Sequence, residues 1–179
     1  QDTGNFGNLN KGRTGQLVEN AWGGYMDAGD WDRRIQHLVV SRLLLELTEI
    51  APEYFASLKL NTPKTDEDIP DIVDEALFNL ECYRRMQTPE GGIRGGIESE
   101  EHPRHGEGSW QESLAVMAYA PDAWSSYVYA GVAARLVLCF GTREQAMGIT
   151  YRQSAEKAMR WAEAEGLLHR LEGLAGAAR

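Results

Sequence analysis

Three aspartates lie close together in the stretch 23-GGYMDAGDWDRR-34, at positions 27, 30 and 32. Asp27 and Asp30 are three positions apart around an Ala-Gly turn, so both carboxylates can converge on one water molecule. A carboxylate beside a second negative charge has a raised pKa, and such a pair can accept a proton from water. An inverting glycosidase needs this arrangement on the side of its general base.

Aromatic rings flank these carboxylates. Trp22, Tyr25 and Trp31 offer flat apolar faces, which suit the C–H faces of pyranose rings. Two other interpretations of the turn remain open. Asp30 or Asp32 could cap the following helix by accepting from its first N–H groups. The alternating Asp30 and Asp32 could also begin a calcium loop, but neither the glycine nor the distal glutamate of such a loop is in register.

The elements that must position this turn are helices. Apolar residues recur at helical spacing within 32–52, 68–88 and 122–141. Pro52 is expected to end the first of these helices, because proline breaks a helix interior. No convincing alternating strand is present. The predicted fold class is therefore all-α.

A fourth helix is expected to begin with Thr142 and Gln145, whose spacing is that of a capping box, and to end at Gly166. The residues after Gly166 are small and interrupted by glycine, and no closing element is expected there. On the third helix, Trp124 and Tyr127 are expected to pack in the core, since aromatic residues at helical spacing usually do so.

The long loop 89–113 separates the second and third helices. A loop of this length inside a compact domain is usually functional or disordered. Trp110 and the pair His102 and His105 favour function. A solvated acidic run is expected at Glu98, Glu100 and Glu101.

Composition limits the classes of partner. The 179 residues carry a net charge of −9, which argues against a nucleic-acid ligand. No run of about 18 apolar residues is present, so no membrane span is expected. Cys82 and Cys139 lie in apolar periodic segments and are expected to be buried thiols. No metal site and no cofactor are predicted.

Residues 1–22 are polar and rich in Gly and Asn, and we expect an extended lead-in segment there, followed by one domain over 23–179. The chain has neither an initial Met nor a hydrophobic signal core. We therefore expect an internal piece of a longer protein.

Three stretches resemble glycoside hydrolase family 9 in the same order. The first is the DAGD motif at 27–30, and the second is 69-IPDIVDEALFNLECYRRMQ-87 with the following double glycine. The third is 121-PDAWSSYVYAGVAARLV-137. Together the similar segments extend over roughly residues 20 to 165. The chain is thus similar to a family of cellulases and related β-glucan-active enzymes.

The resemblance implies an (α/α)6 barrel of six inner and six outer helices. It also implies inverting hydrolysis of a β-linked, commonly β-1,4, glycan. Asp30 would be the general base, and Asp27 would help to hold the same water. Substrate contacts are expected from Tyr25, Trp31, His102 and Trp110.

The family's general acid is a glutamate near the far end of the catalytic domain, and no residue of this chain has its sequence context. We therefore expect residues 23–179 to be the N-terminal part of the catalytic domain and to be inactive alone. The expected partners are a β-glucan or a related saccharide and the remainder of that domain. Because about half of the barrel's helices would be missing, inner apolar helix faces such as Ile72–Leu80 are expected to be partly exposed. Secretion or a periplasmic location is expected by resemblance.

Alternatives concern both substrate and class. The continuation Trp31-Asp32-Arg33-Arg34 differs from the one common in cellulases, so xyloglucan, mixed-linkage glucan and chito-oligosaccharides remain open. Another glycan-active (α/α)6 enzyme is a second possibility, and a non-catalytic all-α binding module is a third. A helical-repeat module would show self-similarity at a fixed period, and none is found.

Overall fold

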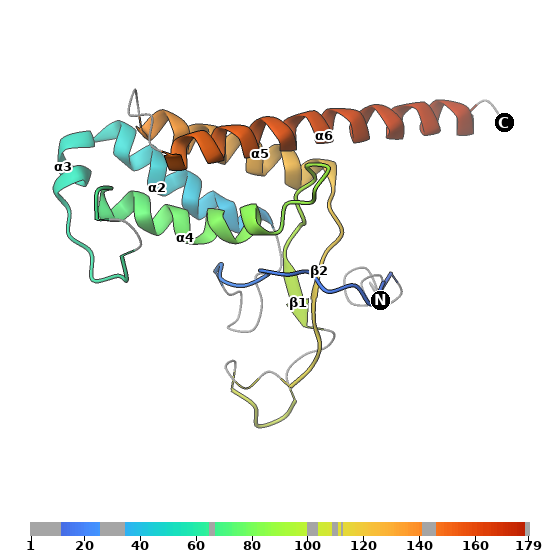
Figure 1. Ribbon diagram of the computed structural model, residues 1–179, viewed down its shortest axis with the longest axis horizontal. Coiled ribbons are helices and arrows are strands. Elements are labelled where there is room, and N and C mark those ends of the chain that lie inside the picture. Colours follow the sequence, from blue (N-terminus) through green and yellow to red (C-terminus); the bar gives the residue numbers. More distant parts are fainter. Residues whose placement is uncertain are drawn as a thin grey trace.

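The structure is a computed structural model, and it describes residues 12–25, 35–64, 67–99, 104–108, 111, 113–140 and 146–177. Helices dominate the described part of the chain, and one short antiparallel ribbon extends from them (Figure 1). Helix α2 lies between α4 and α5, and α5 lies against α6. The predicted all-α class is confirmed, with this ribbon as the exception.

The first helical segment has three parts. A 3-10 turn, η1 (Ile35–His37), leads into α2 (Leu38–Ile50), and α3 (Pro52–Ser57) follows. As expected, Pro52 marks the end of α2. It also begins α3, because proline lacks an N–H that the first turn of a helix does not need.

Helix α4 (Asp71–Arg85) confirms the second predicted helix with shorter bounds than 68–88. Pro70 precedes it in an extended conformation, and its carbonyl accepts hydrogen bonds from the N–H groups of Val73 and Asp74 at 2.9 and 3.0 Å. The last turn carries Arg84 and Arg85, where the helix dipole favours cations.

Asp71, at the start of α4, fastens the preceding loop to the helix. Its carboxylate is nearly fully buried, accepts from the Leu60 N–H at 2.9 Å and pairs with Lys64 at 2.9 Å. The bond from Leu60 has the larger effect and the bond from Lys64 the next largest. Together they hold the pKa of Asp71 below its ordinary value. The same contact raises the pKa of Lys64.

Helices α5 (Ala123–Phe140) and α6 (Ala146–Ala177) form the remaining layer. Asp122 caps α5 by accepting from the Ser125 N–H at 2.8 Å. The expected end of the fourth helix at Gly166 is wrong, since α6 continues to Ala177 and projects beyond the other helices (Figure 1). A single glycine costs a helix only about 1 kcal/mol relative to alanine. The proposed capping residues Thr142 and Gln145 lie outside the described residues.

Strands β1 (Ile97–Ser99) and β2 (Val116–Ala118) form the ribbon, with Glu98 opposite Met117. The expectation of no strand is wrong here. Three residues are too few for an alternating pattern to stand out in the sequence.

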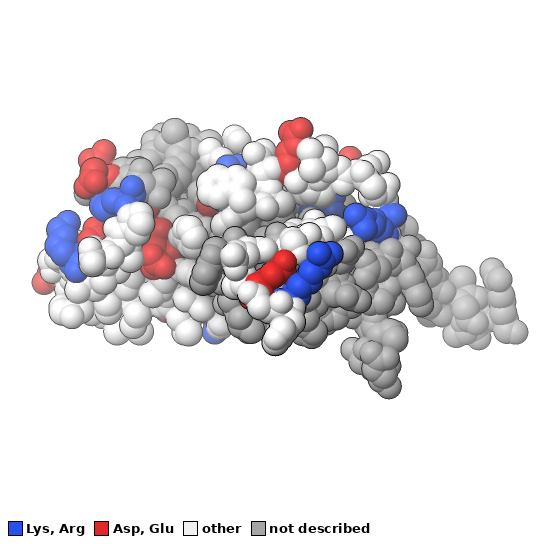
Figure 2. Space-filling model, turned by 90° about the horizontal axis from the view of Figure 1, so that it is seen from below, with Lys and Arg blue, Asp and Glu red and all other residues white. Residues whose placement is uncertain are grey.

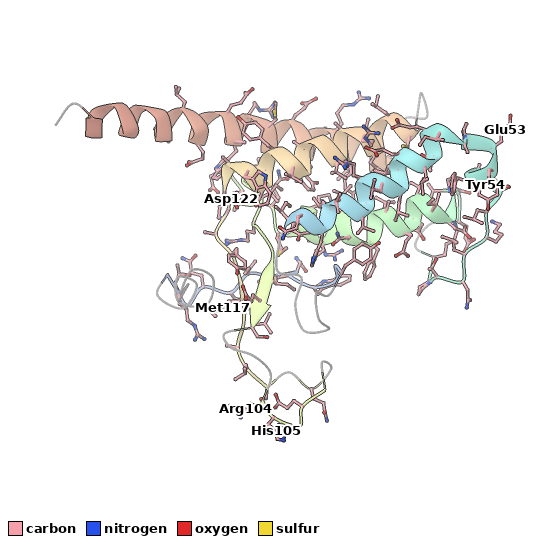
Figure 3. The ribbon with its side chains drawn as sticks, turned by 180° about the vertical axis from the view of Figure 1, so that it is seen from behind. Glu53, Tyr54, Arg104, His105, Met117 and Asp122 are labelled. Atoms are coloured by element: carbon pink, nitrogen blue, oxygen red, sulfur yellow. The ribbon has the colours of Figure 1, made fainter. Side chains whose placement is uncertain are left out.

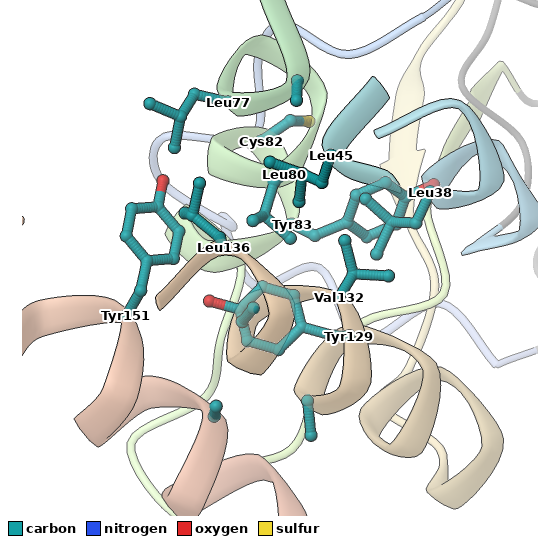
Figure 4. Packing of buried hydrophobic residues seen from close by; sticks show 14 of the residues in the cluster. Leu38, Leu45, Leu77, Leu80, Cys82, Tyr83, Tyr129, Val132, Leu136 and Tyr151 are labelled. Atoms are coloured by element: carbon teal, nitrogen blue, oxygen red, sulfur yellow. The ribbon is translucent and has the colours of Figure 1, made fainter. Parts of the chain in front are cut away.

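The core lies where α2, α4 and α5 meet, with α6 closing one side (Figure 4). Tyr83 and Tyr129 are its largest fully buried side chains. The larger aliphatic residues around them include Leu38, Leu45, Leu80 and Leu136. The stripe predicted on the second helix is confirmed as buried, so the expected loss of cover over Ile72–Leu80 is wrong for this structure. Cys82 is buried and Cys139 half-buried, and both are free thiols.

An uncovered apolar stripe is present on α2 instead. Val39, Leu43, Leu47 and Ile50 follow helical spacing and are between 37% and 78% exposed. The opposite face of α2 carries Leu38 and Leu45 into the core. None of the described helices is both long enough and apolar enough to cross a membrane.

Candidate functional site

The aspartate turn lies between two flanks that the structure describes. The residues predicted for the site that lie outside the described ranges are Asp27, Asp30, Trp31, His102 and Trp110, and Asp32 lies outside them as well. Their roles, and the capping and calcium interpretations, stay predictions. Tyr25 directly precedes the undescribed segment 26–34 and Ile35 directly follows it.

Tyr25 is bound to helix α4. Its hydroxyl donates toward Glu75, with Oε1 at 2.9 Å and the backbone carbonyl at 3.0 Å. Its ring lies 5.8 Å from that of Phe78. Burial, and then the bond to Glu75, raise the pKa of the Tyr25 phenol, which therefore stays a protonated donor. The substrate contact predicted for Tyr25 stays a prediction, and its hydroxyl already has a partner.

Trp22 is bound to the other end of the same helix. Arg85 Nη2 donates to the Trp22 carbonyl at 2.7 Å, and the guanidinium lies 3.7 Å from the Trp22 ring centre. Such a contact is a cation–π interaction. The Trp22 side chain is still 60% exposed. Its ring therefore presents apolar surface to solvent, a few positions before the aspartates in the sequence.

Between these residues, Gly23 and Gly24 adopt φ angles of +89° and +84°. This left-handed region is open to glycine at little cost. A Cβ atom on Gly23 would also lie 3.0 Å from Arg85 Nη2. The double glycine before the aspartates thus lets the chain lie close against α4.

A pocket of about 410 Å³ opens between this segment, α4 and α6. Its lining includes Trp22, Phe78, Glu81, Arg84, Arg85 and Tyr151. Two bonds of 2.6 Å join Glu81 to Arg84, and Tyr151 donates to Glu81. These polar groups are largely engaged with one another, so the open walls of the pocket are apolar and aromatic.

Local sequence pattern does not predict this pocket. Trp22 and Tyr151 come from opposite ends of the chain, and only the packing of α6 on the other helices brings them together. Phe78 is 49% exposed although it lies on the helix with the clearest apolar stripe. The only indication of the pocket in the sequence is this aromatic residue, which lies outside the apolar stripe of α4.

The ribbon corrects the expectation for Glu98. This residue is fully buried on β1 rather than solvated, and the hydroxyl of Tyr119 donates to its carboxylate. A buried carboxylate needs such a donor, because burial without one is costly. Glu100 and Glu101 lie outside the described residues. At the tip of the loop, Arg104 and His105 are exposed and lie away from the helices (Figure 3).

The expectation for Trp124 and Tyr127 is also wrong. They are 57% and 41% exposed on α5, whose opposite face carries Tyr129 and Leu136 into the core. Residues three positions apart share a helix face, so the two aromatics face outward together.

Charge on the surface is mixed. Among the described residues seen in Figure 2, acidic and basic side chains are interspersed, and no expanse of basic residues is visible on that face. The described residues contain no group of three or more His, Cys, Asp or Glu side chains placed to hold a metal ion.

Two curated relatives match parts of the chain. A xyloglucan-specific endo-β-1,4-glucanase from Bacteroides ovatus is 35% identical over 79 residues, which are 44% of this chain and 13% of the relative. Endoglucanase C from Cellulomonas fimi is 31% identical over 109 residues, which are 58% of this chain and 10% of that relative. The chain therefore spans only a small part of the length of these relatives. No family model matches it.

Solved structures agree with the fold. A metagenome-derived glycoside hydrolase family 9 endoglucanase has a TM-score of 0.70 and 27% identity, and a Bacteroides ovatus family 9 structure has a TM-score of 0.66 and 26% identity. Each similarity covers 79% of this chain and 26% of the other chain. The resemblance to glycoside hydrolase family 9 is thereby confirmed: the chain is similar to part of the (α/α)6 catalytic barrel of that family's endoglucanases.

Proposed function

We propose that the protein is a glycoside hydrolase that cleaves β-linked glucans by inversion. The observation that carries this proposal is the DAGD sequence at 27–30, within a chain whose fold is similar to part of family 9 endoglucanases. The domain boundary at residue 23 is part of the same proposal. The expected inactivity of residues 1–179 alone stays a prediction.

In this proposal Asp30 is the general base. It takes a proton from a water molecule on the face of the sugar ring opposite to the leaving group. Asp27, three positions earlier, helps to hold that water. A carboxylic acid must protonate the leaving oxygen in the same reaction. In this proposal none of the residues named for the site is that acid. Asp27 and Asp30 supply the base side of the reaction.

The substrate proposal is a β-1,4-glucan, with xyloglucan as the first candidate. The Bacteroides ovatus relative carries that specificity in its name. Trp31, His102 and Trp110 are the proposed substrate contacts, because rings and an imidazole can stack on sugar faces and bond to hydroxyl groups. Net negative charge is compatible with a neutral polysaccharide.

The test is an assay of the full-length protein on xyloglucan, mixed-linkage glucan, soluble cellulose derivatives and chito-oligosaccharides. We expect release of reducing ends from at least one β-glucan. Asp30→Asn removes the base but keeps its shape, so turnover should fall by about two to four orders of magnitude. Binding of the polysaccharide, measured by affinity electrophoresis, should persist.

Near wild-type turnover of Asp30→Asn would exclude this residue as the base. A protein that binds a glucan without cleaving any member of the panel would favour the binding-module alternative instead.

A further inference from the structure

The segment before the aspartate turn lies along one face of α4. Its contacts are made by Glu75, Phe78 and Arg85, with Cys82 at 3.9 Å from the position a Cβ on Gly23 would take. These four positions follow one another at spacings of three, four and three, so they form a single stripe on the helix. The whole stretch from Trp22 to Tyr25 is therefore held by one rigid element.

The segment runs in the direction opposite to the helix. Trp22 is fixed near the C-terminal end of α4 and Tyr25 near its N-terminal end. Residues 75 and 85 are about 15 Å apart along a helix axis. Three steps of extended chain cover at most about 11 Å, and the side chains supply the rest. The segment thus connects two fixed points through a bend at Gly24, which is buried between them.

The Tyr25 end of this attachment is the one nearest to the carboxylates. Asp27 follows Tyr25 by two positions and Asp30 by five. On the other flank, Ile35 is fully buried in the core five positions after Asp30. The two aspartates therefore belong to a short stretch of chain whose ends are both anchored.

We propose that Glu75 is a positioning residue for the reaction: by accepting a hydrogen bond from the Tyr25 hydroxyl, it helps to hold in place the chain that leads to Asp27 and Asp30. This inference rests on the proposed function of the two aspartates. Glu75 does not touch the substrate in this proposal. Its role is exerted through Tyr25, whose ring remains against Phe78.

The expected effect falls on turnover rather than on substrate binding. A misplacement of a catalytic group by about 1 Å can cost about 100-fold in rate. A freed Tyr25 would let the base move relative to the water that it must activate. The contacts of the glucan with other parts of the site would be kept, so KM should change little.

Three variants of the full-length protein separate the possible roles. Tyr25→Phe removes the hydroxyl and keeps the ring. Glu75→Ala removes the acceptor, and Glu75→Gln keeps a neutral oxygen acceptor in place. Glu49→Ala is the matched control, because Glu49 pairs with Arg135 at 3.1 Å between α2 and α5, away from this segment.

We expect Tyr25→Phe and Glu75→Ala each to lower kcat on a soluble β-glucan by about 10- to 100-fold, with KM within about threefold of wild type. The double variant should be no worse than the more severe single variant, because both remove the same contact. Glu75→Gln should recover most of kcat, and Glu49→Ala should leave it unchanged.

A second readout is independent of activity. Hydrogen–deuterium exchange in residues 26–34 should be faster in Glu75→Ala than in wild type, while exchange in α2 and α5 stays the same. Unchanged exchange in 26–34 would overturn the positioning role whether or not the protein hydrolyses a glucan. A lack of any hydrolysis by the wild type would overturn the proposed function, and exchange would still decide whether Glu75 holds the segment.

Two kinetic outcomes would also overturn the inference. If Glu75→Ala lowers the melting temperature but keeps kcat, the contact serves stability alone. If Tyr25→Phe raises KM at constant kcat, Tyr25 acts through a direct substrate contact and not through Glu75.

Discussion

Tyr151 of α6 donates a hydrogen bond to the carboxylate of Glu81 on α4, 70 positions earlier in the chain. Burial alone would raise the pKa of Glu81, but the bonds from Arg84 and Tyr151 outweigh it and leave that pKa below its ordinary value. Burial and the charge of Glu81 in turn raise the pKa of Tyr151. The contact joins two helices at the wall of the pocket described above.

Loss of this bond should destabilise the fold. Tyr151→Phe keeps the ring and removes the donor, and a hydrogen bond to a charged group contributes about 1.5–3 kcal/mol. We expect the free energy of unfolding, from urea denaturation, to fall by about that amount. Tyr54→Phe on α3 is the control, since Tyr54 is 62% exposed. Equal stability of the two variants would show that the Tyr151 bond contributes little.

Acid should weaken the attachment of the loop before α4. The pKa of Asp71 is lowered in the folded protein, so its stabilising effect is fully present above the unfolded value of about 3.9 and is lost as pH falls through the folded pKa. Asp71→Asn should remove this part of the pH dependence. Denaturation midpoints between pH 7 and pH 3 are the measurement, with Glu53→Gln on the exposed first turn of α3 as control. A midpoint curve of Asp71→Asn parallel to wild type would contradict this assignment.

Lys64 gives the opposite sign. Its pKa is raised by the bond to Asp71, so the stabilisation is present below the unfolded value of about 10.4 and is lost at higher pH. The ion pair therefore stabilises the fold over a pH range that is limited by titration of Asp71 on the acidic side and of Lys64 on the basic side.

The double glycine after α4 packs against other elements. A Cβ atom on Gly92 would lie 2.8 Å from both the Trp161 ring and Pro121, which is too close without a shift. Gly92→Ala should therefore cost about 1–3 kcal/mol of stability by overpacking. Gly131 on α5 is the matched control, because a Cβ there meets open space.

Gly131→Ala should instead gain up to about 1 kcal/mol from helix propensity. Opposite shifts of the melting temperature in the two variants are the expected result. A Gly92→Ala protein as stable as wild type would mean that Trp161 moves aside freely.

Periodic segments could be predicted from the sequence because their information is local. The stripe of α4 repeats often enough to identify a buried face, and Arg84 and Arg85 mark its end. Single residues at boundaries were less informative. Gly166 resembles a helix stop, but the helix-forming residues around it outweigh its small cost. The three-residue strands of the ribbon are too short to show a period.

Residue type alone led to wrong expectations about the burial of several side chains. Glu98 belongs to an acidic run in sequence, but strand pairing turns it toward Tyr119. Trp124 is apolar, yet the core side of α5 is already filled by other residues. The contact of Tyr25 with Glu75 joins residues 50 positions apart, so only the packing of the segment on α4 reveals it. Motif similarity could locate the aspartates but not what holds them.

The stereochemistry of the product tests the mechanism most directly. In an inverting site, water attacks from the face opposite to the leaving group, so a β-linked glucan releases an α-anomer first. Proton NMR of the first-formed sugar, recorded before mutarotation, should show that anomer for the full-length protein. Its formation should depend on Asp30 and should slow in Glu75→Ala without a change in stereochemistry, because Glu75 positions the base but does not replace it. A β-anomer as the first product would rule out inversion and with it the role of Asp30 as a base acting on water in a single displacement.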